Sequence, residues 1–589
     1  MPLRIAVHDK DNCSPKKCAK ECISYCPVNR MGQECIITGE KGKPIISEEL
    51  CVGCGICVHK CPFDAIFIVG LPEALAEDLI HQYGVNGFRL FRLPIPKDKM
   101  VTGLLGMNGI GKTTVINILA GFIVPNLGDL EGQPVWDLVL DKYANTEMAG
   151  YLTTVSEGKT RVAMKPQYVD KLAMQYKGRK VQELLYAAGD RERIDELIPK
   201  LNLKPVLNSK LEKLSGGELQ RVAIAGTIGK EADIYFFDEP SSYLDIHQRM
   251  TVSEVIHGLA NEKPVVVIEH DLAVLDFLAD NVHLMYGEKG AYGVVAYPRA
   301  VRTAINTYLS GFLKEENIRF RNKAIKFEAH PPRKDWNTAP LLHFGELVKD
   351  FGSFKVETTG GVIHMGESIG VVGANATGKT TFVKMLAGVV EPTSGWVSTS
   401  VKISYKPQYI RADMSGTVED LLAIAEAHKC PYYDSEIRRP LEIDPLIRKD
   451  VEKLSGGELQ RVAIALALVK DAYIYLIDEP SAYLDSNQRM EAARTIRRVM
   501  EKTGKSALVV DHDVYFIDLV SDSIMVFTGE PSVHGIGNGP YGLREGMNRF
   551  LRDVDVTFRR DQDSARPRIN NRGSGKDREQ RGRGEYYYG

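Results

Sequence analysis

The chain has 589 residues, several times the length of a typical domain, so at least three units with their own cores are expected. Its 44% hydrophobic and 26% charged residues are ordinary globular composition. The formal net charge of −2 argues against a protein that coats nucleic acid non-specifically, so any basic surface must be local.

The start of the chain has the features of neither a signal peptide nor a membrane anchor. Residues 1–10 carry charges where a signal peptide needs an apolar core. No stretch of the sequence approaches the roughly 18 uninterrupted apolar residues that a membrane span requires. We therefore expect a cytoplasmic protein.

Cysteines mark the first predicted domain, a ferredoxin-like α+β unit at residues 1–72. Nine of the ten cysteines lie between Cys13 and Cys61, and in a reducing cytoplasm such crowding indicates metal ligation. One run has the CxxCxxCxxxCP spacing of bacterial 4Fe-4S proteins, in which the fourth cysteine of each run binds the other cluster. We therefore expect two 4Fe-4S clusters, one on Cys13, Cys18, Cys22 and Cys61, the other on Cys51, Cys54, Cys57 and Cys26.

Two alternatives accompany this assignment. Zinc also binds CxxC pairs, but two runs that each end in Cys-Pro favour iron-sulfur clusters. Cys35 has no partner in either run and is expected to be structural, and Cys430 is expected to be a buried filler.

The next domain, residues 73–298, begins with a predicted phosphate-binding loop. GLLGMNGIGKTT at 103–114 lies between an apolar run and a helical pattern, the order of strand, glycine loop and helix that binds phosphate. Glycines let backbone N–H groups approach the phosphates, at the positive end of the helix. One such loop can be a mere tight turn, so the downstream elements decide. The candidate nucleotide-binding residues are Gly106, Asn108, Gly109, Gly111, Lys112 for the β/γ-phosphates, Thr113 for Mg²⁺, and Thr114.

Those downstream elements follow in the expected order. The strand IYFFDEP ends in Asp238, expected to hold Mg²⁺ through water, and Glu239, expected to orient or deprotonate the attacking water. Gln167 is a candidate Mg²⁺ and water sensor, although an isolated glutamine is usually a surface residue. His270 ends an apolar strand and is a candidate for the γ-phosphate; a lone histidine is more often structural, but this one recurs at a matching position.

The whole unit is duplicated. KLSGGELQRVAIA occurs at 213–225 and 453–465, and IYFFDEPSSYLD at 234–245 returns as IYLIDEPSAYLD at 474–485. We therefore predict a second nucleotide-binding domain at residues 341–532. Its matching candidates are Gly373, Asn375, Gly378, Lys379, Thr380, Thr381, Gln408, Asp478, Glu479 and His512.

The first copy contains an insertion. Lys112 and Gln167 are 55 residues apart, against 29 for Lys379 and Gln408, so the first copy is longer by 26 residues. The extra residues fall within about 128–160, where the apolar spacing predicts one or two surface helices; a long loop is the alternative.

A related connector follows each copy, at 299–340 and 533–589. Residues 299–326 hold seven Lys/Arg against two Asp/Glu, and residues 559–589 hold nine against five. These are the local basic patches that the net charge conceals. The Arg/Gly-rich C-terminal tail has little to bury, so it is either disordered or lies along another surface.

The motif LSGGELQ, at 214–220 and 454–460, resembles the signature sequence of ABC ATPases. The resemblance implies two P-loop domains head to tail, with ATP held between the glycine loop of one and the signature of the other. It also implies an aromatic residue for adenine, for which Tyr83, Phe88 and Phe351 are candidates that could equally be core. Site one would combine Lys112, Asp238, Glu239 and His270 with Ser455 and Gly457, and site two Lys379, Asp478, Glu479 and His512 with Ser215 and Gly217.

A two-cluster domain before twin ABC domains, with IRFR-type connectors, is similar to one family, the E subfamily of ABC proteins, the ribosome-recycling ATPases or RNase L inhibitors. The resemblance covers essentially the whole chain. It implies that the protein splits ribosomes after termination, with a release factor or Pelota-like partner, and stays transiently on the small subunit. ATP-driven closure would move the iron-sulfur domain as a wedge. The basic connectors would contact ribosomal RNA phosphates, and the chain would act as a monomer with its domains paired.

Three other classes fit less well. A redox enzyme is conceivable from the clusters, but the sequence has no flavin or nicotinamide fingerprint, so the clusters are expected to be structural. A transporter ATPase gives the cysteine domain no role. DNA-repair ABC proteins carry long coiled coils between glycine loop and signature, and that interval is too short here.

Overall fold

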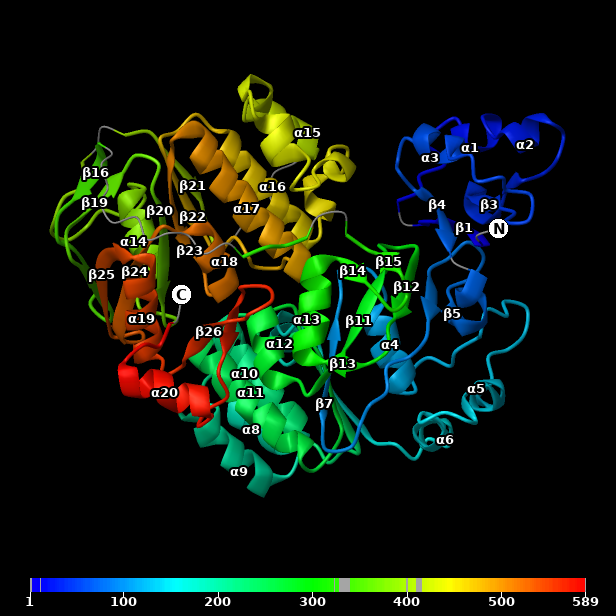
Figure 1. The fold of residues 1–589 in the computed structure, drawn as a ribbon, viewed down its shortest axis with the longest axis horizontal. Coiled ribbons are helices and arrows are strands. Elements are labelled where there is room, and N and C mark those ends of the chain that lie inside the picture. The colour runs from blue at the N-terminus through cyan, green and yellow to red at the C-terminus, as the bar shows by residue number, and fades with distance from the viewer. Residues whose placement is uncertain are drawn as a thin grey trace.

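The computed structural model describes residues 3–10, 12–71, 73–321, 324–327, 339–398, 401–408 and 416–587. Figure 1 shows a small N-terminal unit beside two larger units, with the C-terminal segment lying between those two. Parts of the predicted first connector (322–323 and 328–338) and the last two residues of the tail lie outside the described residues. None of the described helices combines the length and apolar character needed to cross a bilayer.

The N-terminal unit is a small α+β domain organised around its cysteines. An antiparallel pair, β1 with β4, packs beside a short hairpin, β2 with β3. Cys26, Cys35 and Cys57 are buried in its core with Ala6, Val28, Ile36, Ile46 and Ile66. The elements are β1 (Leu3–His8), α1 (Glu21–Ser24), α2 (Pro27–Arg30), β2 (Ile36–Thr38), β3 (Pro44–Ile46), α3 (Ile56–Lys60) and β4 (Ile66–Leu71).

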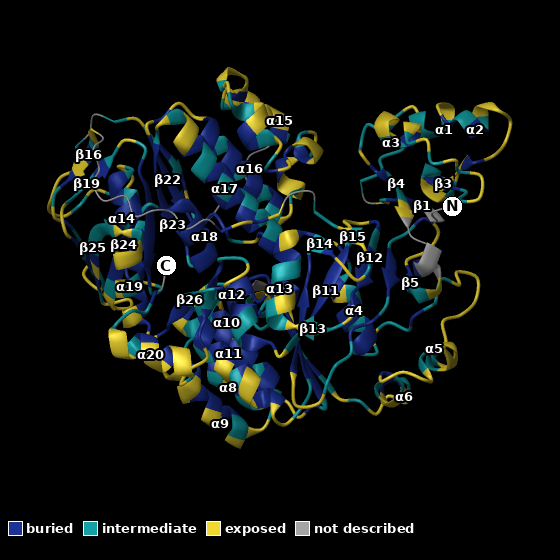
Figure 2. Ribbon diagram, viewed as in Figure 1, coloured by how far each residue is buried: buried dark blue, intermediate teal, exposed yellow. Residues whose placement is uncertain are grey.

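The first large unit is built on a mixed sheet with the order β5-β6-β12-β11-β7-β10-β9-β8, and β13 pairs with β11. Strands β11, β7, β10, β9 and β8 run parallel, and their near-continuous apolar runs are buried on both faces, as Figure 2 shows. The strands are β5 (Leu79–Gln82), β6 (Arg89–Phe91), β7 (Val101–Leu105), β8 (Val162–Lys165), β9 (Ile234–Asp238), β10 (Val265–Ile268), β11 (Asn281–Glu288), β12 (Tyr292–Val295) and β13 (Arg299–Ala300).

The second large unit repeats this sheet in the order β17-β18-β25-β24-β20-β23-β22-β21, and β16 pairs separately with β19. Each strand of this eight-stranded order therefore has a counterpart in the first unit, as the sequence repeat predicts, whereas the β16-β19 pair belongs to the second unit alone among the described residues. The strands are β16 (Pro340–Phe344), β17 (Leu347–Asp350), β18 (Lys355–Thr358), β19 (Gly361–His364), β20 (Ser368–Gly373), β21 (Ile403–Lys406), β22 (Ile474–Asp478), β23 (Ser506–Val510), β24 (Ser523–Glu530) and β25 (His534–Gly542).

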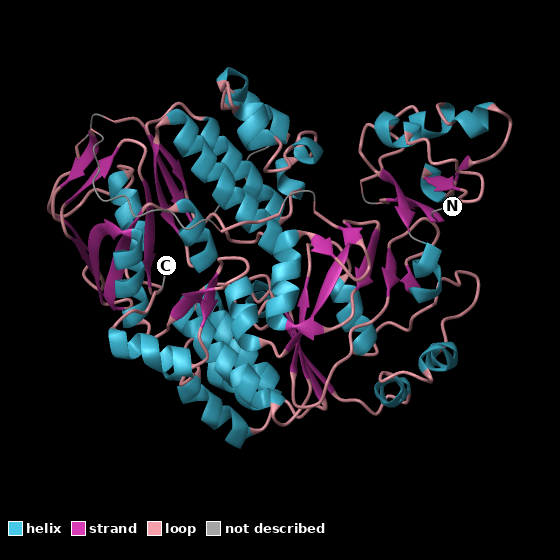
Figure 3. Cartoon of the chain, viewed as in Figure 1, coloured by secondary structure: helices cyan, strands magenta, loops and turns pink. Residues whose placement is uncertain are grey.

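Helices lie against both sheets (Figure 3). In the first unit they are α4 (Lys112–Leu119), α5 (Trp136–Tyr143), α6 (Ala149–Ser156), α7 (Asp170–Gln175), α8 (Val181–Ala188), α9 (Arg191–Lys200), α10 (Gly216–Ile228), α11 (Ile246–Ala260) and α12 (Leu272–Leu278), followed by α13 (Val301–Ser310). In the second they are α14 (Lys379–Leu386), α15 (Val418–Ile424), α16 (Gly456–Val469), α17 (Ser486–Thr503) and α18 (Val514–Val520), followed by α19 (Leu543–Asp553).

The insertion of the first copy contains two helices, α5 and α6, and not one long loop. Val139 and Leu152 are fully buried against the same core as α4. The Tyr151 hydroxyl donates to the Leu119 carbonyl at the end of α4, at 2.6 Å. The two helices are thus attached to the helix that begins at the phosphate-binding lysine.

The C-terminal tail is folded onto the large units. It forms β26 (Phe558–Arg560), β27 (Pro567–Ile569) and α20 (Gly575–Arg583), and Tyr587 is buried at 2% exposure. Its composition left two alternatives, disorder or a position along another surface. The described part of the tail lies along another surface, because some of its arginines pair with buried carboxylates elsewhere in the chain.

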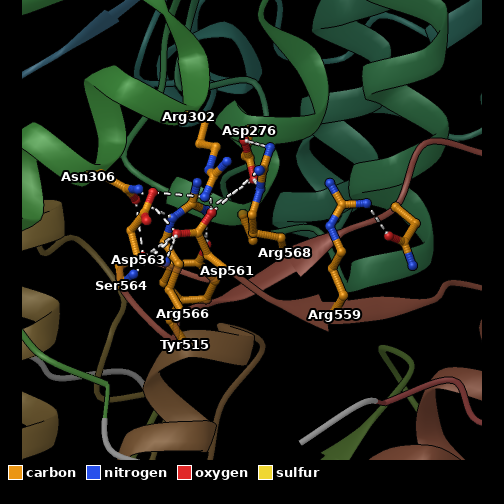
Figure 4. Close-up of polar contacts among 12 residues, drawn as sticks. Asp276, Arg302, Asn306, Tyr515, Arg559, Asp561, Asp563, Ser564, Arg566 and Arg568 are labelled. Carbon is orange, nitrogen blue, oxygen red and sulfur yellow. Dashed lines mark hydrogen bonds and ion pairs between the residues drawn. The ribbon is translucent and has the colours of Figure 1, made fainter. Parts of the chain in front are cut away.

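Arg566 is the centre of this attachment (Figure 4). The Arg566 side chain is fully buried; its Nη1 lies 3.0 Å from Asp276 of α12 and 2.8 Å from the Tyr515 hydroxyl of α18. Arg568 also pairs with Asp276, at 2.7 Å, and Arg302 of α13 pairs with Asp561, at 2.8 Å. The connectors therefore join the two large units directly.

These ion pairs change the expected use of the basic connectors. Arg566 and Arg568 are neutralised by carboxylates of the same chain, so their charge is not available to ribosomal RNA phosphates. In the first connector Lys314, Arg319 and Lys326 remain exposed. Any contact of the connectors with phosphates must therefore use exposed basic side chains such as these three.

Candidate nucleotide sites and cysteine cavities

Both glycine loops connect a buried central strand to a helix that starts at the predicted lysine. Gly111 has a φ of 90°, and a Cβ there would lie 2.7 Å from the Phe88 ring, so only glycine fits. The Lys112 ammonium donates to the carbonyls of Gly106, at 2.8 Å, and Met107, at 2.9 Å. In the second copy Lys379 donates to Gly373, at 2.9 Å, and Ala374, at 2.6 Å. Each ammonium thus lies inside its own loop, and burial lowers the pKa of both lysines to about 8.

The strand-end aspartates have the surroundings of a cation site. Asp478 is fully buried, and neither oxygen of its carboxylate has a hydrogen-bond partner of normal geometry among the described residues. Burial raises its pKa, while the neighbouring Thr380 hydroxyl opposes that shift. Burial and the adjacent Glu239 raise the pKa of Asp238 to about 7. A buried carboxylate next to a threonine hydroxyl offers oxygen ligands that are otherwise unpaired. Mg²⁺ prefers such hard oxygen ligands, so these residues fit a Mg²⁺ ion.

Each candidate catalytic glutamate lies between a glutamine and a histidine. Gln167 Nε2 donates to Glu239 Oε1, and Gln408 Nε2 donates to Glu479 Oε1, both at 2.7 Å. In each copy the histidine Nε2 lies 3.7 Å from the same glutamate oxygen. Burial holds the pKa of His270 and His512 well below the usual value, so both imidazoles are neutral. The structure brings together the Gln, Glu and His that the sequence places far apart.

Two further pairs support this arrangement and were missed by the sequence analysis. Lys165 donates to the carbonyls of Asp238 and Glu239, at 2.7 and 3.2 Å, and Lys406 repeats these contacts in the second copy. Gln220 of the first signature helix donates to the Glu239 carbonyl, at 2.7 Å. The carbonyl contacts hold the turn after Asp238, where Glu239 has a φ of 47°. The lysine recurs in both KPQY segments and the glutamine in both SGGELQ segments, and this repetition could have identified them from the sequence.

The two large units contact each other at both glycine loops. The Asn108 backbone N–H donates to Asp485 of the second copy, at 3.0 Å, and the Asn375 N–H donates to Asp245 of the first, at 2.9 Å. Ser486 also donates to the His270 carbonyl, at 2.6 Å. The repeated Tyr-Leu-Asp at 243–245 and 483–485 could have revealed this pairing, because identical residues recur after both strand-end glutamates.

The signature serines occupy helix N-termini. Ser215 and Ser455 cap α10 and α16, each in a reciprocal capping box with the glutamate three residues later. Glu458 of α16 lies 3.7 Å from Lys289, whose side chain borders Gly109 in the opposite glycine loop. The second signature therefore lies beside the first glycine loop. Gly217 and Gly457 occupy the first turn of the same helices, where the backbone N–H groups are directed outward.

The candidate adenine residues fall into two kinds. Tyr83 and Phe351 are 45% and 52% exposed, so both rings present a free surface. Phe88 packs against Gly111 of the glycine loop, and Phe354, which the sequence analysis overlooked, packs in the same way against Gly378. Phe354 occupies the position before β18 that Phe88 occupies before β6, so an alignment of the two copies would have found it.

The loop that carries Tyr83 and Phe88 also holds the cysteine domain. Asn86 Nδ2 donates to the carbonyls of Ala6 and Ile46, at 3.0 Å each, and His8 N–H donates to the Asn86 carbonyl, at 2.7 Å. At the base of the loop Arg89 Nη2 donates to both carboxylate oxygens of Glu48, at 2.9 Å each. The N-terminal domain is therefore held by the loop that carries two candidate adenine residues of site one.

The cysteines line two separate cavities. One is lined by Cys13, Cys18, Cys22 and Cys61; the other is lined by Cys26, Cys51, Cys54 and Cys57, with Cys35 beside them. Each cavity takes its fourth cysteine from the other run. Burial raises the pKa of Cys22 to about 11 and of Cys57 to about 12, so bound iron would be needed to keep these thiols ionised. Four cysteine thiols lining one cavity are the donor set that a 4Fe-4S cluster requires.

Known families match both parts of the chain. The ABC transporter family model matches residues 92–242 and 358–482. A possible Fer4-like domain in RNase L inhibitor matches residues 3–34, and a 4Fe-4S binding domain matches residues 44–67. These matches confirm the predicted fold class, two ABC-type P-loop domains and an N-terminal ferredoxin-like domain.

Individual relatives match over nearly the whole length. An uncharacterized ABC transporter ATP-binding protein of Methanocaldococcus jannaschii is 50% identical, covering 100% of this chain and 98% of its own. Translation initiation factor RLI1 of Saccharomyces cerevisiae is 44% identical, covering 99% and 98%. A structure described as ribosome-bound archaeal Pelota and ABCE1 superposes with a TM-score of 0.95 at 55% identity, covering 100% of this chain and 99% of that one. The archaeal ribosome recycling factor aABCE1, in complex with the stalk protein aP1, is 51% identical with a TM-score of 0.82, covering 87% and 99%.

Proposed function

Since this chain belongs to the E subfamily of ABC proteins, the ribosome-recycling ATPases or RNase L inhibitors, we propose that it splits ribosomes into subunits after termination. A release factor or Pelota-like protein is its partner, and it stays transiently on the small subunit in the cytoplasm. The chain is an ATPase of the ABC type. The mutual contacts of the two large units at both glycine loops carry the proposal, because closure of one unit on the other must then act on both sites.

Each ATP site uses groups from both units. Lys112 and Lys379 bind the phosphates, and the opposite signature, Ser455 or Ser215, binds the γ-phosphate at its helix N-terminus. When bound at Asp238 with Thr113, or at Asp478 with Thr380, Mg²⁺ supplies charge neutralisation at the phosphates. Glu239 and Glu479 accept a proton from the attacking water, which Gln167 and Gln408 help to position. His270 and His512, neutral and 3.7 Å from these carboxylates, contact the γ-phosphate.

The cysteine domain holds two 4Fe-4S clusters in the two cavities, with a mechanical role. Iron analysis of anaerobically purified protein should give about eight iron atoms per chain, since each cluster holds four. About two zinc atoms per chain would contradict the assignment. The predicted boundaries are 1–72 for this domain, 73–298 and 341–532 for the ATPase domains, and 299–340 and 533–589 for the connectors. The two connectors begin with β13 (Arg299–Ala300) and β25 (His534–Gly542), which are strands of the ATPase sheets, so each ATPase domain extends through its strand.

Fastening of the cysteine domain to the adenine-side loop supports a wedge mechanism. Asn86 and Arg89 belong to the first ATPase domain but contact the cysteine domain, so closure around ATP moves both together. The loop thereby links nucleotide state to the position of the wedge.

The decisive experiment measures ribosome splitting by light scattering, with and without the Pelota-like factor. Wild-type chain and ATP should split ribosomes, whereas Glu239→Gln with Glu479→Gln should bind ATP and stay on small subunits without turnover. An Asn86→Ala, Arg89→Ala variant should hydrolyse ATP but split poorly. Splitting that follows the oxidation state of intact clusters would favour a redox role and contradict the wedge.

A further inference from the structure

Each cysteine cavity is lined by one almost completely buried hydrogen-bond donor that is not among its four predicted ligands. His8 lines the first cavity with Cys13, Cys18, Cys22 and Cys61. Cys35 lines the second with its four cysteines. Neither residue belongs to the two CP-terminated runs, and both are almost completely buried, at 4% and 1% exposure. Two buried donors, one at each cavity, therefore need a hydrogen-bond partner.

His8 lies at the end of β1 with its ring beside the first cavity. Its backbone N–H donates to Asn86, but its ring Nε2 is buried and has no hydrogen-bond partner among the described residues. A buried polar nitrogen without a partner is unfavourable, so a native protein normally supplies one. The sulfurs of a cluster on Cys13, Cys18, Cys22 and Cys61, which line the same cavity, would supply acceptors for that ring nitrogen.

Cys35 lies where β2 begins, beside two cysteines of the second set. Its thiol is within hydrogen-bonding reach of Cys26 and Cys51, and its Sγ lies 3.9 Å from the Ser47 carbonyl. Once Cys26 and Cys51 bind iron they are thiolates, and a charged acceptor forms a stronger hydrogen bond than a neutral carbonyl at that distance. The Cys35 S–H is thus placed to donate to a ligand sulfur.

We propose that His8 and Cys35 are hydrogen-bond donors to the sulfurs of the first and second cluster, one for each, and are not iron ligands. The proposal rests on the proposed presence of two clusters. Hydrogen bonds to cluster sulfurs stabilise added negative charge and so raise the reduction potential. Because an N–H is a stronger donor than an S–H, His8 affects its cluster more than Cys35 does.

The test uses full-length protein with its clusters, purified without oxygen. Iron per chain is measured first, and the one-electron reduction of each cluster by dithionite is then followed by EPR in a potentiometric titration. His8→Phe removes the ring N–H and His8→Gln retains an N–H donor. Cys35→Ala removes the thiol, and Cys35→Ser retains an O–H donor. His59→Phe, an exposed residue of α3, and Cys430→Ala are the controls.

We expect unchanged iron in all six variants. His8→Phe should make the reduction potential of the first cluster more negative, and Cys35→Ala should do the same for the second cluster. The shift should be larger for His8→Phe. His8→Gln and Cys35→Ser should return toward the wild-type value, and the two controls should not move. A loss of about four iron atoms in Cys35→Ala would make Cys35 a ligand and overturn its part of the proposal. Unshifted potentials at full iron content would overturn the proposal as a whole, whereas wild-type protein without iron would contradict the clusters themselves.

Discussion

Sites one and two contain the same candidate catalytic groups but have different contacts between the two large units. At site one, Glu458 of the opposing signature helix lies between Lys449 of its own unit, at 3.2 Å, and Lys289 of the other, at 3.7 Å. In the repeat these two lysine positions are occupied by Ser209 and Pro531. Site one therefore gains a charged contact across the domain interface from residues that site two does not have.

The adenine sides differ as well. In site one the loop at 83–88 is fastened to the cysteine domain through Asn86, whereas Phe351 of the matching turn is half exposed. Duplication has kept what the chemistry of hydrolysis requires, while the surroundings of each site follow the domain that lies next to it. The cysteine domain thus directly contacts the loop that carries Tyr83 and Phe88, the candidate adenine residues of site one.

The largest expected effect comes from removing one catalytic carboxylate at a time. Glu239→Gln should inactivate site one and Glu479→Gln site two, each slowing its own site by about 10²-fold or more, because the amide accepts no proton from water. Single-turnover hydrolysis and nucleotide binding should be measured together. If sites one and two are coupled only through domain closure, binding of ATP will survive in both variants; parental hydrolysis in the double variant would refute the catalytic role.

Arg566 should affect both sites equally, because it joins α12, which follows His270, to α18, which follows His512. Arg566→Met leaves Asp276 buried with only Arg568 as partner, so unfolding free energy should fall by about 3 kcal/mol. Arg572→Met is the control, since Arg572 is 59% exposed, and should cost less than about 1 kcal/mol. Stability is measured by denaturant unfolding. If the unfolding midpoints of Arg566→Met and Arg572→Met coincide, the buried pair is not a determinant of stability.

The pH dependence of site two follows from the raised pKa of Glu479. Burial and the adjacent Asp478 raise it to about 7, and the carboxylate must be ionised to accept a proton. Hydrolysis by the Glu239→Gln variant, in which site two alone is active, should therefore fall as pH drops through about 7, by about tenfold per unit well below it. A turnover rate that stays level from about pH 8 to about pH 5.5 would contradict this. The same profile for Glu479→Gln then measures how far site one differs.

The smallest expected effect is at Lys289, because this side chain is 60% exposed. Lys289→Met should weaken ATP-dependent closure of site one by about 0.5 kcal/mol, with a smaller dependence on salt than in the parent. Lys402→Met is the matched control, since that exposed lysine pairs with Asp471 of its own unit. Nucleotide occlusion at each site should be measured with Lys289→Met added to the Glu239→Gln and Glu479→Gln variants. Occlusion should change at site one alone, and an equal change at both sites would refute a site-specific contact.

Much of this molecule is predictable from local sequence. The strand, glycine loop and helix order, the strand-end Asp-Glu pairs and the spacing of the cysteine runs are determined by backbone geometry over a few residues, and the repeat supplies each motif twice. The exchange of the fourth cysteine between runs is implied by the resemblance to two-cluster ferredoxins, and each predicted set lines one cavity.

The rest depends on how distant segments meet. Asn86 on the cysteine domain, Lys289 against Glu458 and Arg566 against Asp276 join residues between 40 and 290 positions apart, and no local pattern encodes such contacts. For this reason the sequence suggested basic connectors for RNA phosphates, whereas the fold uses Arg566 and Arg568 of the tail in ion pairs with the buried Asp276. A charge in the sequence has no fixed partner, and only the tertiary structure decides whether a carboxylate of the same chain or the phosphate of another molecule neutralises it.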